Sequence, residues 1–216
     1  MQVDVRVAQL LCSRLCHDLV SPIGAVNAGL ELIEEGADDD GRAIGLIATS
    51  AGEASRRISF FRMAFGMAAG AEGEAPLKDA RGLAAGLLQG GKATLDWPAE
   101  ADADGASLPP DAAKVVLNMV LIASESLPRG GVIGVRTRAL DDGLGVAVTA
   151  AGTGAKLRDD LGLALAGKAA GDDLTARNAH AHSAQCLARD LGATIEAEVD
   201  AAGEVRLAVL IPTEWR

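Results

Sequence analysis

The 216-residue sequence contains no tyrosine, and aromatic residues make up only 2% of it. Basic residues are also scarce: 20 lysines and arginines face 30 aspartates and glutamates, giving a formal net charge of −10 at pH 7. A nucleic-acid-binding protein needs basic side chains to neutralise phosphates and, for single strands, aromatic rings on which bases stack. We therefore expect proteins, and no nucleic acid, as partners.

Long apolar segments and a secretion signal are missing as well. No apolar run approaches the roughly 20 residues that a helix needs to cross a bilayer, and the N-terminus lacks a basic start and a small-residue cleavage site. There are three cysteines, an odd number; Cys12 and Cys16 stand one helical turn apart within an apolar pattern. This favours reduced thiols near a core. We expect a cytoplasmic protein that does not contact membranes.

Apolar residues recur at steps of three and four over residues 8–34 and again from Ile44 to Phe65. Both patterns are typical of long amphipathic helices. The polar segment 34–41 between them predicts a short turn and an antiparallel hairpin. The apolar seam is too wide for one hairpin to cover, so we expect a homodimer in which two hairpins form a four-helix bundle.

Segment 66–76 is rich in small, turn-forming residues and marks the end of the helical part. Beyond it, strand-like and helix-like patterns alternate, which predicts a two-layer α/β domain. The expected strands are 93–97, 132–138, 144–149, 194–199 and 205–211, and the expected helices are 77–89, 111–127 and 174–191. We divide the chain into a helical-hairpin domain (1–69), a linker (70–76) and an α/β domain (77–216).

His17 lies on the first predicted helix, about 165° from the centre of its apolar face, and therefore points outward. Ser13, Arg14 and Ser21 share this face, so an oxyanion or a docking partner would meet an accessible imidazole on a small polar surface with one cation. Pro22 removes a backbone donor inside the helix and predicts a bend beside the histidine. Taken alone, these residues also fit a solvated surface histidine and a tolerated kink.

The other histidines and the cysteines provide no good set of metal ligands. Cys12 and Cys16 fall on or near the core side of the first helix, whereas His17 points away from it. His180 and His182 lie on opposite sides of a predicted helix start and are expected to be surface residues. We expect no metal site on this chain.

The residues from His17 to Ile23 read H-D-L-V-S-P-I and resemble the dimerisation box of histidine kinases, H-[ED]-L-x-x-P-[LI]. The resemblance implies that His17 carries a phosphoryl group, that Asp18 is a base or orienter, and that the hairpin forms a dimeric four-helix bundle. The receiver domain that docks here would bring the magnesium ion and a lysine, so this chain needs no cofactor. In an antiparallel hairpin Arg56 and Arg62 return past His17, where they either help to dock an acidic receiver or are solvated charges.

The second domain resembles the ATP-binding domain of histidine kinases, but it departs from that family where the nucleotide binds. Ile122 replaces the magnesium-binding asparagine, and an isoleucine cannot ligate a hard cation. Ala150 replaces the adenine-reading aspartate of D-x-G-x-G, although Gly152 and Gly154 remain. The later glycine-rich segment is absent, since residues 179–183 read A-H-A-H-S.

Together the two domains resemble the ChpT-type histidine phosphotransferases, which keep a kinase-like hairpin and an ATPase-like domain that no longer binds nucleotide. The stretch 61–66 at the end of the second helix fits this family too. The resemblance implies an α + α/β fold and a phosphotransferase that relays a phosphoryl group between receiver-domain aspartates through a phosphohistidine. The alternatives are an ATP-dependent sensor histidine kinase with divergent motifs and a non-catalytic dimerisation scaffold.

Overall fold

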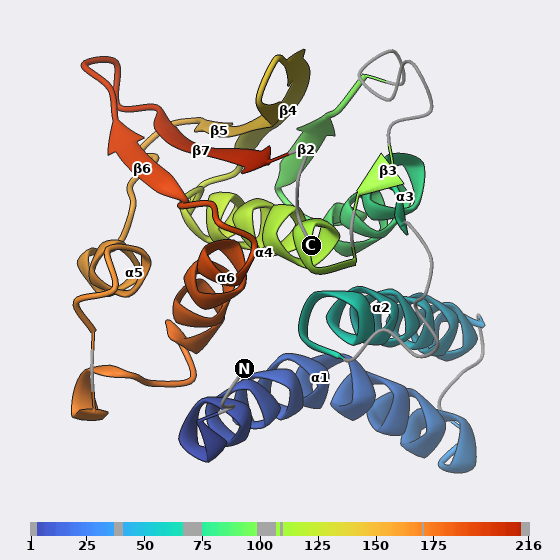
Figure 1. Cartoon of the computed structure of the whole chain (residues 1–216). Coiled ribbons are helices and arrows are strands. Elements are labelled where there is room, and N and C mark those ends of the chain that lie inside the picture. The colour runs from blue at the N-terminus through green and yellow to red at the C-terminus, as the bar shows by residue number, and fades with distance from the viewer. Residues whose placement is uncertain are drawn as a thin grey trace.

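The computed structural model describes residues 4–36, 41–66, 75–98, 107–108, 110–169 and 171–212. Helices α1 (Val5–Glu34) and α2 (Arg42–Phe65) form the hairpin, as Figure 1 shows. The remaining elements are β1 (Ala75–Pro76), α3 (Leu77–Leu88), β2 (Ala93–Asp96), β3 (Ser107–Leu108), α4 (Pro110–Glu125), β4 (Gly131–Leu140), β5 (Gly143–Ala151), α5 (Asp159–Leu165), the 3-10 helix η2 (Gly171–Asp173), α6 (Ala179–Asp190), β6 (Glu196–Val199) and β7 (Val205–Pro212).

Helix α1 is continuous across Pro22. Asp4 caps its N-terminus by accepting a hydrogen bond from the Arg6 backbone N–H at 2.9 Å. The Pro22 ring is buried, and the α1 ribbon bends about midway along its length (Figure 1). This agrees with the expected bend, because proline deletes one backbone hydrogen bond and crowds the preceding turn.

A close contact between α1 and α2 fixes the register of the hairpin. A Cβ on Gly29 would lie 2.6 Å from Ile47 Cγ1 and 3.2 Å from the Ala43 carbonyl oxygen, so only glycine allows this approach. Both helices rise about 1.5 Å per residue. Counting back from this contact places His17 at the level of Ser59, in the half of the hairpin nearer the α/β domain.

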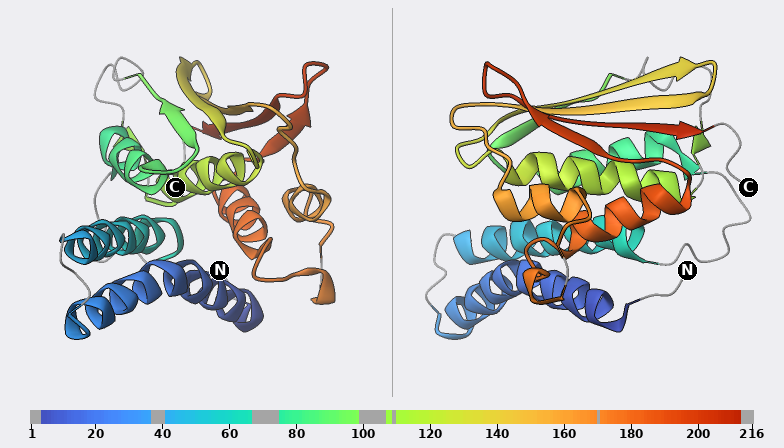
Figure 2. Two further views of the ribbon diagram at one scale, coloured as in Figure 1. Left: turned by 180° about the vertical axis from the view of Figure 1, so that it is seen from behind. Right: turned by 60° about the vertical axis from the view of Figure 1, so that its left-hand side comes forward.

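The α/β domain contains a five-stranded mixed sheet in the order β2-β4-β5-β7-β6, in which β2 and β4 are parallel and the other neighbours antiparallel. Figure 2 shows helices covering one face of the sheet, with the hairpin beyond these helices. Gly130 and Gly131 turn the chain from α4 into β4 at φ values of 83° and 149°, as their position in the sequence predicted. The two-layer α/β fold is therefore confirmed.

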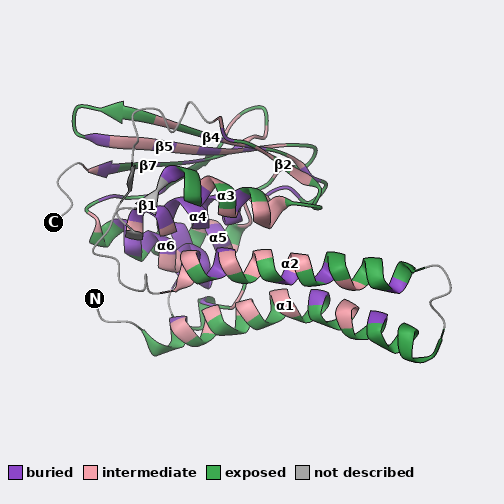
Figure 3. Cartoon of the chain, turned by 90° about the vertical axis from the view of Figure 1, so that its right-hand side faces the viewer, coloured by how far each residue is buried: buried purple, intermediate pink, exposed green. Residues whose placement is uncertain are grey.

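One continuous core joins the hairpin to the α/β domain. Phe60 and Phe61 of α2 are fully buried in it, and the Phe61 ring stacks on Phe65 at 5.1 Å. The buried Asn118 of α4 donates a hydrogen bond to the Ala64 carbonyl at 3.1 Å. In Figure 3, by contrast, the far half of the hairpin extends beyond the domain and is mostly exposed. The α/β domain therefore holds the half of the hairpin that carries His17.

Some boundaries differ from those that the sequence predicted. Helix α6 begins at Ala179 rather than at Leu174, because turns occupy the intervening residues. The short elements α5, η2, β1 and β3 were not predicted. Most of the predicted 70–76 linker lies outside the described residues, and its end forms β1, which pairs with β3. No described helix combines the length and apolarity needed to span a membrane.

Candidate functional site

His17 is the one histidine in the sequence of the hairpin, and its ring is exposed. Its side chain is 87% exposed, and Ser13 and Ser21 on the neighbouring turns are exposed as well. The outward direction predicted from the helical pattern is therefore confirmed. The position allows a second protein to reach the imidazole without any movement of the hairpin.

Asp18 contacts this ring. The carboxylate is only 14% exposed; its Oδ1 lies 3.1 Å from His17 Nδ1, and its Oδ2 accepts a hydrogen bond from Arg14 Nε at 2.8 Å. An ionised carboxylate can only accept hydrogen bonds, so His17 Nδ1 must carry the proton. The lone pair then resides on Nε2, the nitrogen available to an electrophile.

Arg14 connects the two domains. Its side chain is 13% exposed, and its Nη2 donates to Glu125 Oε1 of α4 at 2.5 Å. Burial lowers the pKa of Arg14, but its contacts with Glu125 and Asp18 outweigh this effect and raise the pKa above its ordinary value. Arg14 therefore spans from α1 to the α/β domain instead of standing free on the surface.

Glu125 is shared between two arginines. Its Oε1 accepts from Arg14, and its Oε2 accepts from Arg158 Nη1 at 3.3 Å. Burial raises the pKa of Glu125, and both arginines oppose this rise. The net effect raises the pKa of Glu125 above its ordinary value, and the two guanidinium groups compensate the charge of its carboxylate.

His180 completes the cluster and corrects a prediction: it is fully buried rather than a surface residue. Its Nδ1 lies 3.5 Å from Arg14 Nη1, and its Nε2 lies 3.6 Å from Glu125 Oε1. Burial, together with the nearby cations Arg14 and Arg158, holds the pKa of His180 well below its ordinary value of 6.5. The ring is therefore neutral at physiological pH.

The two cysteines of α1 also differ from their predicted placement, because both Cys12 and Cys16 are exposed in this chain. They lie beside Val20 and Ile23 on an apolar strip of α1 that α2 does not cover. Within the described part of the chain, no three histidine, cysteine or acidic side chains gather where they could hold a metal ion.

The positions that depart from the kinase pattern lie in the core of the α/β domain. Ile122 and Ala150 are fully buried. Gly152 is needed for backbone packing, since a Cβ there would approach the Gly130 carbonyl oxygen within 2.4 Å, and Gly154 has a φ of 74° that favours glycine. Both retained glycines thus have structural reasons that involve no nucleotide.

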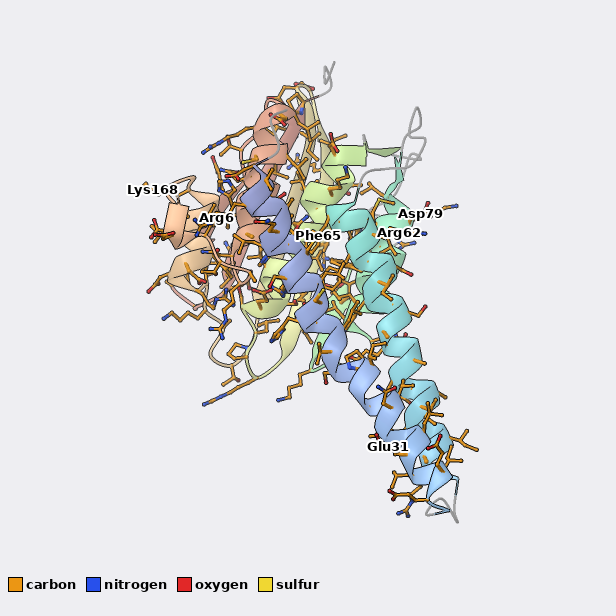
Figure 4. The ribbon with its side chains drawn as sticks, turned by 90° about the horizontal axis from the view of Figure 1, so that it is seen from below. Arg6, Glu31, Arg62, Phe65, Asp79 and Lys168 are labelled. Atoms are coloured by element: carbon orange, nitrogen blue, oxygen red, sulfur yellow. The ribbon has the colours of Figure 1, made fainter. Side chains whose placement is uncertain are left out.

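The remaining candidate residues lie on α2. Arg56 packs along α3, where its side chain runs past Gly86. Arg62 is exposed near the end of α2, and Figure 4 shows it close to Phe65, the residue at which α2 ends. At the other side of the site, Arg6 of α1 binds Asp172 at 3.2 Å and lies toward the segment that contains Lys168 (Figure 4).

Comparison with known proteins identifies the class. The family model described as the histidine phosphotransferase C-terminal domain matches residues 77–203, more than half of the chain. The chain therefore belongs to the histidine phosphotransferase family.

Individual relatives agree with this assignment. The chain is 44% identical over 135 residues to the protein phosphotransferase ChpT of Brucella abortus (strain 2308), and the match covers 61% of each protein. A solved structure described as a bacterial phosphotransferase superposes with a TM-score of 0.82 at 31% identity, covering 97% of this chain and 98% of that one. The histidine kinase AdeS of Acinetobacter baumannii shares the fold, with a TM-score of 0.50 at 13% identity over 92% of this chain and 98% of its own.

Sequence reasoning missed the cluster that joins the domains, made of Glu125, Arg158 and His180. One signal was present: Glu125 ends a helix that is otherwise almost wholly apolar from residue 115 onward. A carboxylate that is buried in that position requires a cation. The sequence pattern alone does not identify Arg14, 111 residues away, as that cation.

Proposed function

We propose that this protein is a histidine phosphotransferase that takes a phosphoryl group from one receiver-domain aspartate onto His17 and passes it to another, without ATP. The observation that carries the proposal is the exposed His17 ring, with Asp18 holding Nδ1 and leaving Nε2 accessible. Membership of the histidine phosphotransferase family supports the same chemistry.

The chemical step uses the atoms that this geometry presents. The Nε2 lone pair of His17 attacks the phosphorus of an aspartyl phosphate; an N–P bond forms, and the P–O bond to the receiver carboxylate breaks. The proton stays on Nδ1, where Asp18 Oδ1 accepts its hydrogen bond, and the carboxylate compensates the positive charge that develops on the ring. The reverse step delivers the phosphoryl group to a second receiver, and the magnesium ion that neutralises the phosphoryl oxygens is expected on the receiver.

Two features support a relay that does not use ATP. Ile122 and Ala150 put apolar, fully buried side chains where the kinase pattern has a magnesium ligand and an adenine acceptor. In addition, residues 179–183, where the later glycine-rich segment is absent, place His180 against Arg14 and Glu125, so this segment contacts the protein itself.

The exposed side of the hairpin supports a dimer. Large apolar side chains at Val20, Ile23 and Leu30 of α1 and at Ile44 and Ile58 of α2 are each at least 47% exposed. An apolar strip this long is rarely left in water. We therefore infer that a second hairpin covers it in a four-helix bundle and leaves His17 on the outer surface.

Two donors distinguish the three candidate functions. The protein is mixed either with a labelled phosphorylated receiver domain or with labelled Mg-ATP, and acid-labile label on the protein is measured. A histidine phosphotransferase accepts label from the receiver alone. Labelling from ATP would indicate a kinase. If no phosphorylated receiver of the source organism and no ATP labels the protein, the result would indicate a non-catalytic dimerisation scaffold.

A further inference from the structure

We propose that Glu125 is a positioning residue for phosphoryl transfer. Together with His180 it holds the Arg14 side chain in place. Arg14 in turn fixes Asp18 in the orientation that holds the His17 ring. The inference rests on the proposed function, because it describes how the α/β domain acts on the phosphoacceptor. The α/β domain lacks the ATP-binding residues of the kinase pattern, and this inference gives that domain a direct part in the transfer.

The argument begins with the shape of Arg14. Its guanidinium is planar, with donors at fixed angles, and it uses two edges at once. Nε donates to Asp18 Oδ2 at 2.8 Å, and Nη2 donates to Glu125 Oε1 at 2.5 Å. Since the group is rigid, the direction of the bond to Glu125 sets the plane of the guanidinium and therefore the direction of Nε.

His180 restrains the same group from a third side. Arginine can only donate, so the His180 Nδ1, 3.5 Å from Arg14 Nη1, must be the nitrogen that lacks a proton. The proton then lies on Nε2, which is 3.6 Å from Glu125 Oε1 and makes no hydrogen bond, so the ring restrains Glu125 by packing alone. A fully buried ring has little freedom to turn, so His180 limits the movement of both charged partners.

Arg158 holds Glu125 in place on the side opposite Arg14. Arg158 binds its Oε2 at 3.3 Å, and the same guanidinium contacts both oxygens of Asp160 at 3.0 and 3.1 Å. Arg158 also donates to the Arg177 carbonyl at 2.8 Å, two residues before the start of α6. Glu125 therefore has both oxygens engaged, which makes it a fixed point for Arg14.

The effect on His17 comes through the two oxygens of Asp18. While Arg14 holds Oδ2, Oδ1 faces the ring and accepts from Nδ1. If Arg14 were free to turn, Asp18 could rotate, and His17 would adopt the tautomer mixture of a free imidazole. The exposed docking surface would not change. We therefore expect a lower kcat for phosphoryl transfer and an unchanged KM for the receiver.

The test combines ring spectroscopy with kinetics. The chain has three histidines, so histidine labelled with ¹⁵N gives few signals, and His17→Gln and His182→Gln assign them. The variant is Glu125→Gln. The control is Asp96→Asn, which removes one carboxylate from an ion pair with Arg136 on the sheet, at a half-exposed position.

In the wild-type protein and in Asp96→Asn we expect His17 to carry its proton on Nδ1. In Glu125→Gln the ring should show mixed tautomers, and kcat for transfer should fall about 10-fold with the KM for the receiver within about twofold. A folded Glu125→Gln protein with the wild-type tautomer and kcat would overturn the inference. So would a raised KM with unchanged kcat, because Glu125 would then be a docking residue.

A second variant covers the case in which Glu125→Gln does not fold. Arg14→Lys keeps the buried charge, but a single ammonium cannot reproduce the two fixed edges. We expect a folded protein with the same tautomer change and slower transfer, and wild-type behaviour would contradict the inference. His17→Gln separates the two claims: if it still accepts label, the proposed function fails whatever Glu125 does.

Discussion

His17 and His180 are both linked to Arg14, the first through Asp18 and the second directly, yet their surroundings are opposite. The His17 side chain is 87% exposed, whereas His180 is 0% exposed. The first ring has one orienting contact and one open nitrogen, as a nucleophile requires. The second is enclosed, with Nδ1 3.5 Å from Arg14 and Nε2 without a hydrogen bond, and it suits a fixed support. The comparison shows that two chemically identical side chains linked to one arginine differ in burial and in contacts, and therefore suit different tasks.

The largest expected effect is on transfer at the exposed ring. His17→Gln removes the attacking nitrogen, so transfer from a phosphorylated receiver should fall by roughly 1,000-fold or more. The free energy of unfolding should change by less than about 0.5 kcal/mol, because the side chain is exposed. Rapid-quench labelling and urea unfolding measure the two quantities. A large loss of stability would mean that His17, too, is a structural residue.

The buried ring should show the reverse pattern. His180→Ala leaves a cavity and removes a neighbour from both Arg14 and Glu125, so the free energy of unfolding should fall by about 3 kcal/mol. His182→Ala is the matched control on the same helix, where His182 is only partly buried. Equal stability of the two variants in urea unfolding would contradict the assigned role of His180.

The exposed apolar strip gives the next effect. Ile23 is 48% exposed in this chain, and Ile23→Glu would place a carboxylate in the proposed dimer interface. We expect the dimer dissociation constant to rise roughly 100-fold. Leu163→Glu is the control, because Leu163 is 49% exposed on α5, outside the hairpin. Analytical ultracentrifugation distinguishes the two, and a wild-type protein that is monomeric at micromolar concentration would refute the dimer.

The smallest effect is a dependence of stability on pH. His180 has a folded-state pKa well below 6.5, so the unfolded chain takes up a proton at this site before the folded chain does. The contribution of neutral His180 to the free energy of unfolding is therefore complete above about pH 6.5. Below that pH the free energy of unfolding falls by about 1.4 kcal/mol per pH unit. Urea unfolding between about pH 5 and 8 measures this slope. His180→Gln should flatten the slope more than His182→Gln does, and equal slopes would argue against a neutral buried ring.

The sequence was sufficient where a pattern depends on neighbours along the chain. The steps of three and four residues predicted α1 and α2, and Gly130-Gly131 predicted the turn into β4. The outward direction of His17 followed from its angle on the helix. These features are local, so they needed no knowledge of what packs against them.

The sequence was not sufficient where a helix has several neighbours. Arg14 shares the polar side of α1 with His17, but it forms an ion pair with Glu125 of α4 and lies 3.5 Å from the His180 ring of α6. Hydrophobic periodicity cannot detect such a contact. The prediction that Cys12 lies near the core was wrong for the opposite reason. The apolar arc of α1 is wider than the part that α2 buries, so Cys12 is apolar in its pattern but exposed.

The most direct test of the central claim is to locate the phosphoryl group. The protein is incubated with a phosphorylated receiver domain, without ATP, and the modified residue is mapped by mass spectrometry under alkaline conditions. We predict acid-labile phosphate on His17, which disappears when a second, unphosphorylated receiver is added. Phosphate on another residue, or phosphate on His17 that appears only when ATP is present, would contradict the account.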